Sequence, residues 1–228
     1  MTEIFAVSLL EESAFENLRP ALMTRVPEVT RMKIGSFLRS NDAQRSLLGE
    51  LLARNLLTKK CGNDLPDTPF STGEKGKPGP DGYQGVHFNI SHSGNWVVVA
   101  LSADAVGVDV EKMRKVPEGV AHRFFSEKEN NLLNDAAGEA EKAEIFFTLW
   151  TLKESFLKAI GTGLTKSLSS FTVVKTGKEE FILADDPEAE GYFLKTFYLC
   201  EGYKLAACAT ADRFTDHVTI LTVADLAG

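Results

Sequence analysis

Cysteine is scarce in this 228-residue chain and is not spaced for a common structural use. The three cysteines, Cys61, Cys200 and Cys208, are an odd number and form no CxxC pair. This excludes a disulfide framework and a zinc site of the paired-cysteine type, and it argues for free thiols in a reducing compartment. We therefore expect a cytoplasmic location.

Long apolar runs and a targeting segment are also missing. No stretch approaches the roughly 20 apolar residues that a membrane-spanning helix needs, and the opening MTEIFAVSLLEESAF lacks a basic region and soon becomes acidic, unlike a signal peptide. Hydrophobic residues make up 43% of the chain and charged residues 25%, which is the usual balance of a globular protein. The sequence predicts one large domain or two small ones with no membrane partner.

Positive charge is in deficit overall but is concentrated in one segment. The net charge is −7, yet nine Lys/Arg against three Asp/Glu lie between Arg19 and Lys60, so the remainder carries −13. The overall acidity and the absence of an aromatic and basic RNA-binding signature argue against nucleic acid. The basic segment fits either helices with solvated faces or an electropositive wall for an anion.

The apolar pattern predicts two helix-then-strands units. In the first, residues 4–10 form a strand, Asn41-Asp42 caps a helix rich in leucine over 43–57, and a long loop over 61–83 leads to a hairpin that turns at 92–94. A strand over 105–111 follows. In the second, a helical region over 117–135 leads to a helix over about 140–160 that ends at Gly161. The last strands are expected over 170–176, 179–184, 192–200, 203–211 and 217–223.

This repeated order predicts an α+β fold of two similar halves related by pseudo-twofold symmetry. Each half is expected to pack a long helix on a small, mostly antiparallel sheet, with the halves covering residues 1–104 and 105–228. The strand over 105–111 then lies at the seam, where pockets commonly form.

Two carboxylates share one face of that seam strand. In AVGVDVEK (105–112), three valines alternate with Gly107, Asp109 and Glu111, so both acids project to one side. Neighbouring like charges destabilise a strand. Exposure to solvent is the commoner explanation, and a bound cation is the alternative.

A third carboxylate, Glu154, lies on the mostly apolar helix of residues 145–160. It could form an ordinary surface pair with Lys158. It could also join Asp109 and Glu111 in an all-oxygen site for a hard cation such as Mg²⁺.

The two acidic motifs together resemble a known family. GVDVEK (107–112) and LWTLKESFLK (149–158) match the signatures (V/I)G(V/I)D(V/I)E and WxxKEAxxK of 4′-phosphopantetheinyl transferases, with Ser155 in place of alanine. GKP (76–78), FNISHSG (88–94), RFFS (123–126) and GTGL (161–164) agree with the two-halved, surfactin-synthetase-activating type. The resemblance runs from about Asp42 to Ala209.

The resemblance implies a chemistry for the acidic site. The family transfers the phosphopantetheine arm of coenzyme A to a serine of a carrier protein and releases adenosine 3′,5′-bisphosphate. By this likeness Asp109, Glu111 and Glu154 hold Mg²⁺, or Mn²⁺, against the pyrophosphate of coenzyme A. Glu154 also takes the serine proton, directly or through a water, and Lys158 stabilises the leaving phosphate.

The resemblance also assigns the coenzyme A contacts. His92 contacts the phosphates with Ser91 beside it, although His92 alone would read as a turn residue bonded to nearby backbone. Lys33 (or Arg31 in its place) and Arg45 meet the 3′-phosphate. The candidate catalytic residues are Glu154, Lys158 and His92, and the candidate coenzyme A ligands are Lys33, Arg45, Lys77, Ser91, His92 and Lys158. Trp150 is expected in the core, where it fixes the helix that carries Glu154.

The implied partners are apo acyl- or peptidyl-carrier proteins. The segment 114–125 is expected to dock the carrier through its basic residues, and because both halves lie in one chain we expect a monomer. One alternative is a non-catalytic module that binds coenzyme A or a carrier protein. Another is a generic Mg²⁺-dependent nucleotide phosphotransferase, against which the absence of a GxxxxGK(S/T) loop argues.

Overall fold

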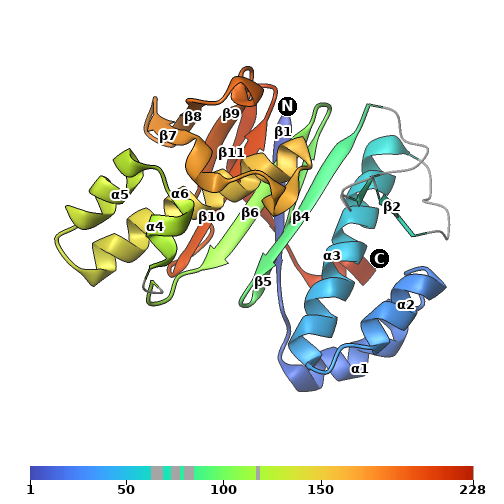
Figure 1. Cartoon of the computed structure of the whole chain (residues 1–228). Coiled ribbons are helices and arrows are strands. Elements are labelled where there is room, and N and C mark those ends of the chain that lie inside the picture. The colour runs from blue at the N-terminus through green and yellow to red at the C-terminus, as the bar shows by residue number, and fades with distance from the viewer. Residues whose placement is uncertain (63–68, 73–77, 80–84, 117–118, 228) are drawn as a thin grey trace.

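The computed structural model describes residues 1–62, 69–72, 78–79, 85–116 and 119–227. It is an α+β protein of two similar halves, each with one 22-residue helix packed on one sheet (Figure 1). The prediction of the fold class is therefore confirmed. None of the helices within the described ranges is long and apolar enough to cross a membrane.

The N-terminal half is built on a four-stranded sheet in the order β11-β1-β5-β4. Its strands are β1 (Thr2–Ser8), β4 (His87–Ser93), β5 (Trp96–Ser102) and β11 (Phe214–Leu221). Helix α3 (Ser40–Cys61) packs its leucines against this sheet. The buried ones are Leu47, Leu48, Leu51, Leu52, Leu56 and Leu57. The remaining helices of this half are α1 (Glu12–Met23), α2 (Glu28–Gly35) and the terminal α7 (Val223–Ala227).

The start of α3 differs from the prediction. The helix begins at Ser40 rather than after Asn41-Asp42, and Arg39 at the N-cap makes no side-chain cap bond. Asp42 lies in the first turn, where it pairs with the Arg45 guanidinium and faces the positive end of the helix dipole. Its carboxylate is thus engaged within the helix, which explains why the capping signal was misleading.

The C-terminal half is built on a five-stranded sheet in the order β6-β10-β9-β8-β7. Its strands are β6 (Val106–Lys112), β7 (Thr172–Lys175), β8 (Glu180–Ala184), β9 (Phe193–Phe197) and β10 (Tyr203–Ala209). Its helices are α4 (Val120–Phe124), α5 (Glu127–Asn134) and α6 (Glu139–Ile160). Helix α6 ends at Gly161 with φ 70°, as the sequence predicts. A small separate ribbon pairs β2 (Ser71–Thr72) with β3 (Pro78–Gly79).

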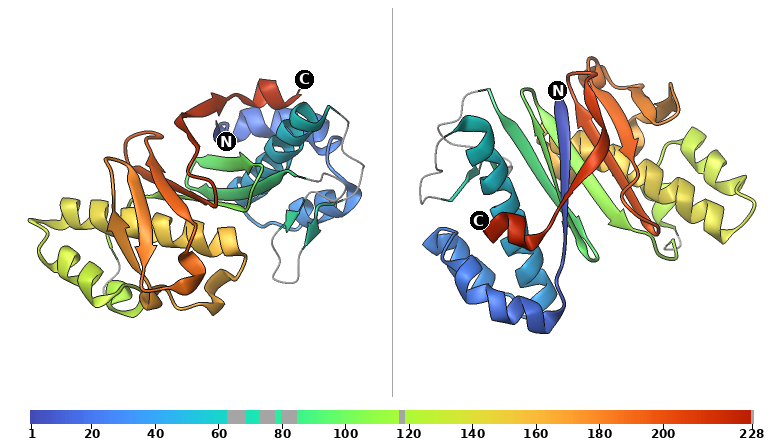
Figure 2. Two further views of the ribbon diagram at one scale, coloured as in Figure 1. Left: turned by 90° about the horizontal axis from the view of Figure 1, so that it is seen from above. Right: turned by 180° about the vertical axis from the view of Figure 1, so that it is seen from behind.

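The last strand returns to the first half. β11 pairs in parallel with β1, and the views from above and behind show it crossing from the second half to lie along β1 (Figure 2). The chain after residue 213 therefore completes the N-terminal sheet. The division of the chain at residues 104 and 105 stays a prediction.

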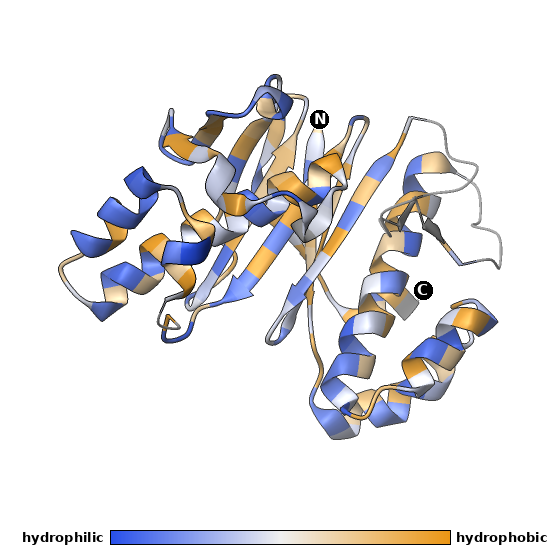
Figure 3. Ribbon diagram, in the orientation of Figure 1, coloured by the Kyte–Doolittle hydropathy of each residue, from blue (hydrophilic) through white to orange (hydrophobic). Residues whose placement is uncertain are grey.

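The seam between the halves is formed by β6, which lies next to β4 and beneath α6. Val106, Val108 and Val110 enter a core between the two sheets, together with Ile4, Ala6, Val98 and Ala100. Hydrophobic and hydrophilic bands alternate along these central strands (Figure 3). The predicted alternation is confirmed, since the opposite face of β6 carries Gly107 and Asp109 toward α6.

Candidate active site

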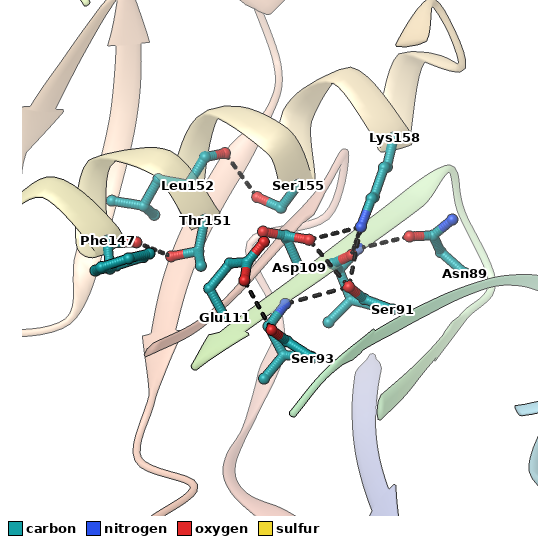
Figure 4. A network of polar contacts seen from close by, with 12 residues as sticks. Asn89, Ser91, Ser93, Asp109, Glu111, Phe147, Thr151, Leu152, Ser155 and Lys158 are labelled. Atoms are coloured by element: carbon teal, nitrogen blue, oxygen red, sulfur yellow. Dashed lines mark hydrogen bonds and ion pairs between the residues drawn. The ribbon is translucent and has the colours of Figure 1, made fainter. Parts of the chain in front are cut away.

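A pocket of about 360 Å³ lies at this seam. Its lining comes from β4 (Ile90, Ser91, His92), β6 (Asp109, Glu111) and α6 (Trp150, Glu154, Lys158). Three separate elements thus bring the three predicted carboxylates, the predicted lysine and the predicted histidine to one cavity. Figure 4 shows Lys158 reaching from α6 to Asp109 and Ser91.

Gly107 makes this convergence possible by letting α6 lie directly on β6. A Cβ at residue 107 would meet the Ser155 carbonyl oxygen at 2.0 Å and the Ala159 nitrogen at 2.4 Å. Ser155 is fully buried at this crossing, and its hydroxyl donates to the Leu152 carbonyl within the helix. The absence of a side chain at residue 107 therefore allows the backbone of α6 to contact β6 directly, next to Glu154.

Asp109 is the most enclosed of the three carboxylates, with 4% of its surface exposed. Its Oδ1 accepts from Lys158 Nζ at 2.6 Å and from Ser91 Oγ at 2.9 Å. Its Oδ2 is buried without a hydrogen-bond partner among the described residues. A buried carboxylate oxygen that lacks a partner is costly, and Asp109 is one of the residues that line the pocket.

The other two carboxylates, Glu111 and Glu154, have raised pKa values. Burial raises the pKa of Glu154, and the negative charge of Asp109 raises it further. Burial likewise raises the pKa of Glu111, although the hydrogen bond from Ser93 opposes this rise. Burial is the main cause of both rises, and a positive ion between these groups would offset it by favouring the charged carboxylates.

These residues fit a hard cation, but they do not form a finished metal site. Within the described ranges, no three His, Cys, Asp or Glu side chains are grouped closely enough to hold a metal ion. Lys158 now supplies the positive charge to Asp109. The orphaned Asp109 Oδ2 and the all-oxygen donor set match what Mg²⁺ requires, so the metal site stays a prediction with this physical support.

A second pocket of about 390 Å³ adjoins the first and shares Ile90 and His92 with it. Three predicted coenzyme A ligands, Lys33, Arg45 and His92, line it. His92 keeps an exposed surface, but neighbouring groups partly enclose its imidazole. This partial burial lowers the pKa of His92, and the charges of Arg45 and Lys158 lower it further. The two cavities thus form a basic compartment and an acidic compartment that meet at one histidine.

Arg45 links this basic compartment to the hairpin. Its guanidinium donates to the Gly94 carbonyl at 2.8 Å while it pairs with Asp42. Arg31 donates to the Val26 carbonyl and is not among the lining residues of this pocket that the structure describes. Lys33 therefore fits the predicted position better than Arg31. Lys77 lies outside the described residues.

Trp150 is only partly in the core that the sequence predicted. Its ring stacks on Phe146 at 5.9 Å and meets Phe124 edge-on at 5.5 Å, while its other side lines the acidic pocket. The tryptophan therefore forms a wall of the site as well as anchoring α6.

The predicted docking segment combines exposed charges with buried aromatic rings. Phe125 belongs to the core of the C-terminal half, and Phe124 is half-buried. The charged side chains Arg114, Lys115, His122 and Arg123 are exposed. Among the described residues of this segment, the exposed charged side chains are thus all basic.

Two polar residues beside the acidic pocket were not predicted. Asn89 accepts from the Val108 amide at 2.9 Å, and Ser93 accepts from the Lys112 amide at 3.1 Å. The signal was available in FNISHSG, where residues 89, 91 and 93 are all polar and share one face of the strand. When a strand with such a polar face lies beside a second strand, its side chains can replace the backbone hydrogen bonds that would otherwise join the two strands.

Comparisons with known proteins agree along the chain. Residues 105–208 match the family model described as the 4′-phosphopantetheinyl transferase superfamily, and residues 16–104 match the model of a 4′-phosphopantetheinyl transferase N-terminal region. The 4′-phosphopantetheinyl transferase ffp of Bacillus subtilis is 38% identical over 203 residues, which cover 88% of this chain and 89% of that protein. The 4′-phosphopantetheinyl transferase Sfp of Bacillus subtilis strain 168 is 35% identical over 206 residues, covering 90% and 91%.

Among solved structures, the holo-acyl-carrier-protein synthase of Thermotoga maritima aligns with 46% of this chain and 61% of its own. The TM-score is 0.38 and the sequence identity is 24%. The sequence relatives, which match almost end to end, are the stronger finding. On their identity and coverage, the chain belongs to the 4′-phosphopantetheinyl transferase superfamily of enzymes.

Proposed function

We propose that this enzyme transfers the 4′-phosphopantetheine arm of coenzyme A to a serine of an apo acyl- or peptidyl-carrier protein, with Mg²⁺ bound, and releases adenosine 3′,5′-bisphosphate. The supporting observation is a pair of adjoining pockets, one within the N-terminal half and one at the seam. One presents Lys33, Arg45 and His92, and the other presents three carboxylates and Lys158. A phosphate-rich ligand spanning both fits this order of charges.

The basic pocket would hold the adenosine end of coenzyme A. Lys33 and Arg45 offer positive charge for the 3′-phosphate. His92, which lies between the compartments and has a lowered pKa, is neutral at pH 7 and can donate one hydrogen bond to a phosphate oxygen.

The acidic pocket would hold the pyrophosphate and the reacting serine. Asp109, Glu111 and Glu154 are the residues that would hold Mg²⁺, with Mn²⁺ as a possible substitute. When bound, the ion supplies charge neutralisation for the pyrophosphate oxygens. Glu154, whose pKa burial raises, is suited to accept the serine proton, directly or through a water. Lys158 Nζ can move from Asp109 to the leaving phosphate.

The partner and the assembly state are part of the same proposal. Of the exposed basic residues of segment 114–125, Arg114 lies next to the acidic pocket, since it shares a small cavity with Glu111 and Trp150. An acidic carrier surface would meet these charges first. Both compartments come from one chain, so we propose that the enzyme is active as a monomer.

Intact-protein mass spectrometry tests the transfer directly. The enzyme is incubated with coenzyme A, Mg²⁺ and each of several apo carriers, and the expected result is a carrier heavier by one phosphopantetheine. A carrier whose acceptor serine is changed to alanine serves as the control. Light scattering in the same buffer should show a monomer.

Calorimetric titration separates the alternatives. Binding of coenzyme A but not ATP is expected, and preference for ATP would favour a nucleotide phosphotransferase. Tight binding of coenzyme A without modification of any carrier would contradict catalysis and favour a binding module.

A further inference from the structure

Side chains take the place of a backbone ladder where the two sheets meet. β4 and β6 are the edge strands of separate sheets, and they lie side by side. Asn89, Ser91 and Ser93 project from β4 and accept the amides of β6; we call these three residues the polar rungs. Their bonds are to the amides of Val108 at 2.9 Å, Val110 at 3.3 Å and Lys112 at 3.1 Å (Figure 4). The rungs thus satisfy an edge that would otherwise be left open.

Two of the rungs also hydrogen-bond to carboxylates that line the acidic pocket. Ser91 Oγ donates to Asp109 Oδ1 at 2.9 Å, and Ser93 Oγ donates to Glu111 Oε2 at 2.7 Å. A hydroxyl has one proton and two lone pairs. Because each hydroxyl accepts an amide of β6, its proton is free to hold the carboxylate one residue earlier on that strand.

Ser91 has no remaining capacity. It accepts from both the Val110 amide and Lys158 Nζ, the latter at 3.0 Å, and it donates its one proton to Asp109. Ser93 forms the simpler connection, from one amide to one carboxylate. Its effect on Glu111 can therefore be isolated more cleanly than that of Ser91.

The turn that follows the rungs is clamped from both halves. The Asn95 amide donates to the Tyr203 hydroxyl of β10 at 3.0 Å, and Arg45 of α3 donates to the Gly94 carbonyl. Gly94 has φ 56°, and a Cβ there would meet the Tyr203 hydroxyl at 2.3 Å. These contacts fix the end of β4, so the register of the rungs against β6 is held at a second point.

We propose that Ser93 is a positioning residue that aims Glu111 into the acidic pocket, and that the polar rungs together align this carboxylate strand with the His92 hairpin. This inference rests on the proposed function, because it treats Glu111 as a ligand for a divalent cation. Residues that orient metal ligands without touching the metal commonly contribute 10–100-fold to affinity. Ser93 occupies such a position toward Glu111.

The test measures Mg²⁺ binding by calorimetry, with Mn²⁺ as a second probe, on the full chain and before any carrier is added. Ser93→Ala should weaken binding by about 10–100-fold, while Ser93→Thr, which keeps the hydroxyl, should stay within a few-fold of wild type. Ser102→Ala is the matched control. Ser102 is a buried strand hydroxyl that bonds to Thr2 Oγ1 at 3.1 Å and to the Asp104 amide at 3.3 Å, and it does not line the acidic pocket.

The outcomes distinguish this inference from the proposed function. Wild-type metal affinity in a folded Ser93→Ala variant, or an equal loss in Ser102→Ala, would overturn the positioning role and leave the proposed function intact. Absence of Mg²⁺ and Mn²⁺ binding by the wild type would overturn both. If the alanine variant does not fold, Ser93→Cys replaces it, because the thiol keeps the volume but donates weakly.

Discussion

Lys153 Nζ lies 2.6 Å from Glu129 Oε2, and solvent reaches neither side chain. The Lys153 ammonium also donates hydrogen bonds to the carbonyls of Leu168 at 2.7 Å and Phe171 at 2.6 Å. Glu129 in turn accepts the amides of Ser126 and Val173, both at 2.8 Å. One buried pair thus ties α6 to the start of α5 and to the chain entering β7, directly beside Glu154.

Breaking this pair should destabilise the fold severely. Lys153→Met leaves Glu129 charged and buried without its partner, so the free energy of unfolding is expected to fall by about 3–5 kcal/mol. Urea denaturation measures the change. Asp216→Ala is the control, because Asp216 pairs with Lys195 at 3.2 Å but is 97% exposed, and its loss should cost less than about 1 kcal/mol. Equal costs for the two variants would contradict a structural role for the buried pair.

Gly107→Ala should damage the site without changing any side chain that lines the acidic pocket. The added methyl would lie 2.0 Å from the Ser155 carbonyl oxygen, which is backbone, so α6 must move away from β6. That shift carries Glu154 and Lys158 away from Asp109. We expect a loss of turnover larger than the loss of stability, measured by steady-state kinetics and thermal unfolding. Gly35→Ala, where a Cβ meets nothing within 4 Å, is the matched control and should keep full turnover.

The sequence predicted the helices and strands whose apolar residues recur at regular spacing, and it predicted the carboxylates that the family motifs place on them. The leucine pattern of α3, the alternation of β6 and the carboxylates at 109, 111 and 154 all lie where that reasoning put them. The leucine and valine patterns depend on residues close together in the chain, so local periodicity was enough. The meeting of Glu154 with Asp109 and Glu111 joins distant parts of the chain and was implied by the two family motifs.

Local sequence patterns do not predict which strands or side chains far apart in the chain will pair. β11 looks like any amphipathic strand, and only the free edge of β1, about 200 residues earlier, decides that it pairs there in parallel. Lys153 could equally have been a surface lysine, since its partner Glu129 lies 24 positions away on a different helix. The polar rungs were visible as an alternation, but their meaning depends on β6 lying alongside.

Metal-dependent stability should vary with pH in a defined direction. Burial raises the pKa of Glu111 and of Glu154, so between the ordinary and the raised values the folded state binds more protons than the unfolded state. The free energy of unfolding of the metal-free protein therefore falls as pH rises through that window. Mg²⁺ requires the charged carboxylates, so its stabilising effect should be full above the raised pKa values and vanish below the ordinary range.

Thermal unfolding with and without Mg²⁺ across this pH range provides the measurement. A Glu111→Gln, Glu154→Gln double variant should lose most of both pH effects. Mg²⁺ stabilisation that is independent of pH would count against the carboxylates as ligands.

Arg114→Glu should affect the carrier and spare coenzyme A. Arg114 is exposed and lines a small cavity with Glu111 and the half-buried Trp150, two residues that also line the acidic pocket. Reversing its charge should repel an acidic carrier and raise its KM markedly, because charges at a rim act mainly on encounter. The KM for coenzyme A should stay constant. Lys175→Glu, at an exposed position on β7, is the control. An equal rise in both KM values would argue against docking at this segment.

Metal binding and proton transfer can be separated by comparing two carboxylate variants. Asp109→Ala removes a proposed ligand but not the proposed base, so excess Mg²⁺ should partly restore its turnover. Glu154→Gln keeps an oxygen and the shape of the side chain but cannot accept a proton at neutral pH. Loss of a general base costs about 10²–10⁴-fold, so turnover in the glutamine variant should fall by that order and resist added Mg²⁺. Measuring turnover against Mg²⁺ concentration for both variants distinguishes the roles. Recovery of Glu154→Gln to near wild-type turnover by Mg²⁺ alone would falsify the base assignment and leave Glu154 as a ligand.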